Sequence, residues 1–105
     1  MPRPVRQHPY TEREFLRTIV EYAKLRGWLC YHVVDRKDYA RRTSRGFPDL
    51  VLVRNGTLIF AEVKSEKGKI SHEQRVWLSE LEKIPGLKVY VWRPQDWPQI
   101  EESLK

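Results

Sequence analysis

Two carboxylates and an ammonium group stand in a largely apolar segment, GFPDLVLVRNGTLIFAEVK, which covers residues 46–64. Asp49 and Glu62 supply carboxylate oxygens, which Mg²⁺ takes from proteins in company with phosphate and water. Lys64 could neutralise charge or contact a water molecule or a phosphate group. These residue types suit metal-assisted hydrolysis of a phosphate ester, because a bound cation lowers the pKa of its water and stabilises charge on the phosphate.

A turn at Asn55-Gly56 would bring these side chains together, because this dipeptide is a strong signal for a two-residue hairpin turn. In that register Asp49 lies opposite Glu62 on one face, and Lys64 lies on the same face two residues further on. Opposed carboxylates repel each other, and a bound cation offsets the repulsion. The alternative is a sheet rim where each carboxylate pairs with a surface arginine or lysine. The apolar residues on both sides of the charges favour the metal site.

The remaining elements must position this hairpin. Apolar residues at helical spacing and aromatic or β-branched runs predict the elements. The first is a helix at 12–26 capped by Thr11, followed by strands at 28–34, 49–53 and 58–64. A second helix runs from Ser71 to Pro85, with Gln74 in a capping box. A strand at 87–92 and a last helix from Asp96 to Leu104 complete the order. This order predicts an α/β, α+β-like fold with a central mixed sheet flanked by helices.

Length and composition restrict the class of protein. The chain has 105 residues and suits one domain at 11–105, preceded by a flexible basic arm at 1–10. Its net charge of +6 favours a polyanionic partner, most plausibly nucleic acid. There is no long apolar run for a membrane span, and no glycine-rich loop for a nucleotide cofactor. The single cysteine, Cys30, excludes an internal disulfide framework and fits a cytoplasmic setting.

The charged motifs carry a resemblance to a known family. Pro48-Asp49 followed by Glu62-Val63-Lys64 resembles the PD-(D/E)XK nuclease pattern, and the predicted order of elements is similar to the restriction-endonuclease-like core of that superfamily. GFPDLVLV, FAEVK and SHEQRVWLSEL resemble the VRR-NUC family, whose short members occur widely in phages. The resemblance spans about Thr11 to Trp92. It implies hydrolysis of DNA phosphodiester bonds with Mg²⁺ or Mn²⁺, in a phage or a bacterial host cell.

The same resemblance implies roles for individual residues. Asp49, Glu62 and the carbonyl of Val63 would bind the metal ion. Lys64 would orient the attacking water or help to deprotonate it.

The family usually adds a glutamate from the first helix and a glutamine from the second. Glu12 is our choice for the glutamate, and Glu14 is its competitor, although both could merely complement the helix dipole. Gln74 is our choice for the glutamine, and a site role is compatible with its place in a capping box.

Basic residues surround the expected site along the chain. The polar loop at 35–45 precedes it and a short loop follows Lys64, so both could grip backbone phosphates, and the alternative is a solvated loop. Gly46 could approach a phosphate through its backbone N–H group. The expected DNA-binding residues are Arg36, Lys37, Arg41, Arg42, Ser44, Arg45, Lys67 and Lys69.

We therefore expect a structure-specific endonuclease that cuts branched DNA such as Holliday junctions. A small domain with one site can cut both strands of a junction only by pairing with a second copy, so a homodimer is expected. Two alternatives remain open. One is a restriction-like endonuclease that reads base sequence, and the other is a DNA-binding protein that keeps the fold without catalysis.

Overall fold

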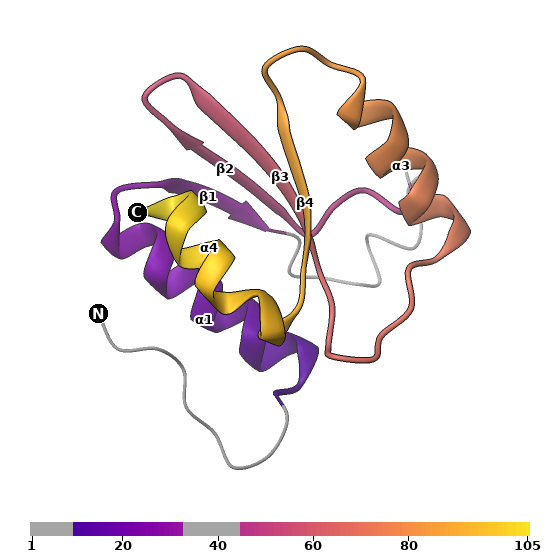
Figure 1. Ribbon diagram of the computed structural model, residues 1–105, viewed down its shortest axis with the longest axis horizontal. Helices are drawn as coiled ribbons and strands as arrows, with labels where there is room; N and C mark the ends of the chain where they lie inside the picture. Colours follow the sequence, from indigo (N-terminus) through magenta and orange to yellow (C-terminus); the bar gives the residue numbers. More distant parts are fainter. Residues whose placement is uncertain (1–9, 33–44) are drawn as a thin grey trace.

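Three α-helices and a four-stranded sheet make up the part of the chain that this computed structural model describes, residues 10–32 and 45–105 (Figure 1). In chain order the elements are α1 (Glu12–Leu25), β1 (Leu29–His32), β2 (Leu50–Arg54), β3 (Thr57–Val63), α3 (His72–Glu82), β4 (Lys88–Trp92), a 3-10 turn at Pro94–Asp96, and α4 (Trp97–Leu104). The predicted α+β fold class and its order of elements are confirmed.

The sheet is mixed, with the strands in the order β1-β2-β3-β4. The pairs β1–β2 and β2–β3 are antiparallel, whereas β3 and β4 run parallel. A parallel pair needs a long crossover connection, and α3 supplies it. In Figure 1, α1 and α4 lie side by side on one side of the sheet and α3 lies on the other.

The central hairpin follows the predicted register. Its paired residues run from Arg54 with Thr57 to Leu50 with Ala61. The turn residues Asn55 and Gly56 have φ angles of 47° and 76°, as a two-residue turn of the primed type requires. Asp49 directly precedes β2 and Glu62 directly follows Ala61, so the hairpin brings the two carboxylates to the same end of the sheet.

The hydrophobic core fixes the end of the sheet that carries Asp49 and Glu62. Alternate residues of β3, Ile59, Ala61 and Val63, are fully buried against the layer formed by α1 and α4. Phe15 of α1 and Ile100 of α4 belong to the same cluster. The intervening residues of β3 face the side of α3, and this is the face on which Glu62 lies.

Most element bounds differ from those predicted by one to three residues, as at the first helix and the first strand, and the predicted side-chain cap of α4 is absent. The first helix ends at Leu25 and not at residue 26, because Arg26 and Gly27 form its cap. The first strand begins at Leu29, and its predicted residues 33 and 34 lie outside the described part. Asp96 precedes α4 as predicted, but its carboxylate accepts a hydrogen bond from the N–H of Arg93 and does not cap α4.

Within residues 10–32 and 45–105, none of the helices combines the length and apolar character that a membrane span requires.

Candidate active site

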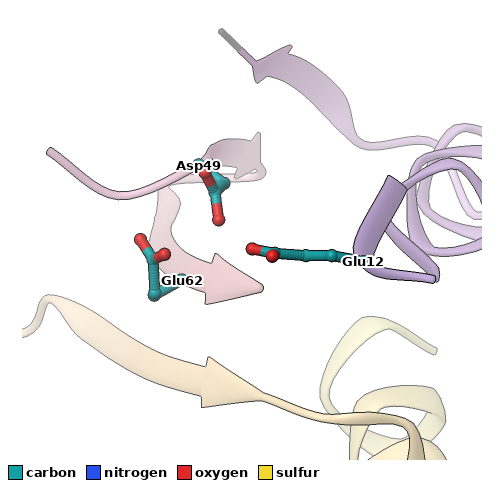
Figure 2. Close-up of side chains that lie close together, drawn as sticks. All are labelled: Glu12, Asp49 and Glu62. Atoms are coloured by element: carbon teal, nitrogen blue, oxygen red, sulfur yellow. The ribbon is translucent and has the colours of Figure 1, made fainter. Parts of the chain in front are cut away.

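Three carboxylates from three separate elements converge at one end of the sheet (Figure 2). Glu12 comes from the first turn of α1, Asp49 from the residue before β2, and Glu62 from β3. One oxygen atom from each lies within 4.8 Å of the others. A set of three carboxylate oxygens at this spacing suits a hard divalent cation.

The two glutamates in the first turn of α1 make different contacts. Glu14 belongs to a capping box, since its carboxylate accepts a hydrogen bond from the N–H of Thr11 at 2.9 Å. Glu12 is the glutamate that reaches the cluster. The pattern Thr-x-x-Glu was the signal in the sequence that could have assigned Glu14 to the cap.

The carboxylate of Asp49 is oriented by the backbone of the neighbouring strand. Its Oδ2 accepts a hydrogen bond from the N–H of Val63 at 2.9 Å. The N–H of the next residue, Lys64, donates to the carbonyl of Trp92 at 3.0 Å, which ties the end of β3 to β4. Asp49 is therefore held against a segment that is itself fixed by the sheet.

Glu62 is buried, with 1% of its surface exposed, and its two oxygens have different surroundings. Oε2 accepts a hydrogen bond from Gln74 Nε2 at 2.7 Å and lies 3.8 Å from Lys64 Nζ. Oε1 is buried and has no hydrogen-bond partner among the described residues. Buried polar atoms are nearly always partnered, so a metal ion at this oxygen would complete the site. The carboxylate donor set and this bare oxygen fit a bound divalent cation.

The pKa of Glu62 reflects its burial beside other carboxylates. The pKa of Glu62 is raised to about 9, chiefly by burial, because the charged form is poorly solvated. The neighbouring Asp49, and to a smaller extent Glu12, contribute to this rise, whereas Lys64 opposes it. A cation between the carboxylates would oppose all of the raising effects.

Gln74 joins the capping of α3 to the carboxylate cluster. Its Oε1 accepts a hydrogen bond from the N–H of Ser71 at 2.8 Å, and its Nε2 donates to Glu62. The cap fixes which end of the amide faces the cluster, so the donor nitrogen is the end presented to the carboxylate. A glutamate could cap the helix equally well but would add a further negative charge here.

The loop before β2 packs closely against α3, a contact that the sequence did not lead us to expect. The ring of Phe47 lies 5.7 Å from that of Phe60 and 5.1 Å from that of Trp77, between centroids. Gly46 has a φ of 88°, and a Cβ placed on it would lie 2.4 Å from the backbone of Glu73. This glycine therefore permits a close approach of the loop to the first turn of α3, and the expected approach of its N–H group to a phosphate stays a prediction.

Only some of the expected DNA-binding residues lie in the described part of the chain. Arg45, Lys67 and Lys69 are exposed. The guanidinium of Arg93 donates to the carbonyls of Ser65 at 2.8 Å and Gly68 at 2.7 Å, which holds the loop that carries both lysines. The predicted residues Arg36, Lys37, Arg41, Arg42 and Ser44 lie outside the described residues.

The raised pKa of Glu62 leads to a prediction for the metal-free protein. The folded state holds this proton up to a pH of about 9, whereas the unfolded chain releases it near the ordinary value of 4.5. The folded state therefore binds more protons between these values, and the free energy of unfolding in EDTA should fall as the pH rises. Glu62→Gln, which resembles the protonated acid, should show a smaller fall, as measured by urea unfolding at several pH values.

The control for this experiment is Glu66→Gln, which removes an exposed carboxylate from the following loop. Its stability should follow the wild-type pH dependence. A Glu62→Gln variant with the same pH dependence as the wild type would contradict the proposed protonation of Glu62.

A mixed sheet between helices, with two carboxylates and a lysine at one end of its central hairpin, is compatible with the restriction-endonuclease-like core of PD-(D/E)XK nucleases. The family model of the VRR-NUC domain matches residues 5–96 of the 105-residue chain. The chain therefore belongs to the VRR-NUC family. A nuclease domain implies DNA as the partner and a divalent metal as the cofactor. No curated protein matches the chain.

Proposed function

We propose that this protein is a divalent-metal-dependent endonuclease that hydrolyses phosphodiester bonds in branched DNA such as Holliday junctions. One observation carries the proposed chemistry. Three carboxylates lie within 4.8 Å of one another, and one of them keeps a buried oxygen that no described residue satisfies.

The residues of the site divide into ligands and supporting groups. Glu12, Asp49 and Glu62 would hold Mg²⁺ or Mn²⁺, and the carbonyl of Val63 is a further candidate ligand. When bound, the cation would lower the pKa of the attacking water and stabilise charge on the phosphate. Lys64 is mostly buried, with 12% of its side chain exposed, and its ammonium lies beside Glu62. We assign to it the orientation or deprotonation of the water.

Cutting both strands of a junction with one site per chain calls for a homodimer. An apolar row across the sheet supports such a contact. Leu29 pairs with Val53, and Val53 pairs with Leu58, so the three side chains share one face. Their exposed fractions are 72%, 37% and 38%. Exposed apolar clusters of this kind commonly mark contacts between proteins.

Cleavage of end-labelled four-way junction, flap, duplex and single-stranded DNA in Mg²⁺ or Mn²⁺ tests this function. Paired symmetric cuts in the junction by a protein of dimeric mass would support the full proposal. Cutting of flaps or single strands alone would keep the chemistry and remove the junction assignment. Cleavage that follows base sequence would favour the restriction-like alternative, and tight binding without any cleavage would favour the non-catalytic one.

Two glutamates in the same helical turn provide a matched pair of variants for this assay. Glu12→Gln should lower the cleavage rate by about 100-fold, or about 2.7 kcal/mol, because it removes one of the charges that would hold the cation. Glu14→Gln should cut at nearly the wild-type rate, because glutamine also serves in a capping box. Initial rates on the best substrate measure both effects, and equal rates for the two variants would remove Glu12 from the site.

A further inference from the structure

A groove of about 470 Å³ lies between α1 and the end of β1, outside the carboxylate cluster. Its lining residues are Arg13, Leu16, Arg17, Val20, Glu21, Lys24 and His32. We propose that this groove holds the backbone of one unpaired DNA strand as the strand leaves the active site. The inference rests on the proposed nuclease function and adds a path for the substrate.

Both walls of the groove begin beside the site. On α1, Arg13 follows Glu12 directly in the chain. On β1, His32 pairs with Leu50, the residue next to Asp49. From this end the groove follows α1 as far as Lys24, which is about 16 Å at 1.5 Å per residue. That length corresponds to at most about five nucleotides, at the 3.4 Å spacing that stacked bases have in one strand of a duplex.

The charges of the groove suit a phosphate backbone. Arg13, Arg17 and Lys24 lie along one side of α1 and are exposed. None of the three forms an ion pair with a described residue, so their charges are free to act on a ligand. Among the described residues of the lining, Glu21 is the one carboxylate, so cations are in excess there. Lysine and arginine side chains that neutralise phosphates dominate the affinity of proteins for DNA.

The shape of the groove favours a single strand over a duplex. Its volume is that of a small-ligand pocket, whereas a duplex needs a broad face. Leu16 and Val20 add apolar surface that could contact sugars or bases. A basic groove that follows the backbone is a common part of sites that bind single strands. His32 closes the end of the groove beside the site, and its Nδ1 is buried and has no hydrogen-bond partner among the described residues.

Charge reversal in the groove tests this path. Arg17→Glu and Lys24→Glu should each weaken the binding of a labelled single strand about tenfold, and each should lower the slope of log affinity against log salt by about one. Lys88→Glu is the matched control, because it makes the same charge change at an exposed position on β4, the opposite edge of the sheet. Fluorescence anisotropy in EDTA measures binding without cleavage, and thermal denaturation shows that each variant folds.

Strand length gives a second measurement. Shortening the strand to about two nucleotides on the side of the scissile bond that occupies the groove should abolish the effect of Lys24→Glu and leave that of Arg17→Glu, because Arg17 lies only about 6 Å along α1 from Arg13. Variants that bind like the wild type, or no more weakly than Lys88→Glu, would overturn the groove assignment. The binding result stands apart from catalysis: a wild type that binds single strands through the groove but cuts nothing would contradict the nuclease proposal alone.

Discussion

Asp49→Asn is expected to lower the rate of DNA cleavage by about 1,000-fold or more while the protein remains folded. Asparagine keeps an oxygen that can accept the hydrogen bond from the N–H of Val63, which is 2.9 Å long in the wild type. It loses the negative charge that would hold the cation, and a catalytic cation contributes several kcal/mol to the stabilisation of the transition state. Since about 1.4 kcal/mol corresponds to a factor of ten, such a loss amounts to several powers of ten in rate.

Asp96→Asn is a close control for this change. Asp96 is also a half-buried aspartate whose Oδ2 accepts a hydrogen bond from a backbone N–H at 2.9 Å, that of Arg93, but it does not belong to the carboxylate cluster. This variant should cleave DNA at the wild-type rate. Mg²⁺ or Mn²⁺ should raise the melting temperature of the wild type and of Asp96→Asn, and should have little effect on Asp49→Asn, because only a bound ion stabilises the folded state. Wild-type cleavage by Asp49→Asn would exclude Asp49 as a metal ligand.

Gly46→Ala is expected to cost about 2–5 kcal/mol of stability and most of the cleavage activity. Its φ of 88° is unfavourable for residues that carry a Cβ, and this Cβ would lie 2.4 Å from the backbone of Glu73 and 2.6 Å from that of Gln74. Relief of that overlap requires the start of α3 to move away from the loop. The movement would draw the amide of Gln74 away from Glu62 and would disturb Asp49, which follows on the same loop.

Gly86→Ala separates the cost of the positive φ from the cost of the overlap with α3. Gly86 has a φ of 79°, but a Cβ at this position would meet nothing within 4 Å. This variant should lose only the conformational part, about 1–2 kcal/mol, and should keep full activity. Urea unfolding and initial cleavage rates at a temperature where both variants are folded provide the comparison. Equal losses in the two variants would show that contact with α3 contributes nothing.

The hairpin and the helix caps could be predicted from the sequence, because both depend on contacts between residues that are near one another in the chain. The φ angles that Asn55 and Gly56 readily adopt determine the turn, and the turn determines the register. Alternation along β3 then decides that Ile59 faces the core and that Glu62 faces the opposite side. The capping box at Ser71 spans only three residues, so its pattern was also visible in the chain.

The rest of the site depended on how the helices dock on the sheet, and no fixed spacing in the sequence encodes that docking. Glu12 reaches Asp49 because Phe15 and the rest of the core hold α1 against one face of the sheet. Gln74 reaches Glu62 because Phe47 packs against Trp77 of α3 and so holds this helix on the opposite face. The groove beside α1 likewise exists only where the helix meets β1. Packing between elements far apart in the chain is set by the shapes of buried side chains, and only the assembled structure contains that information.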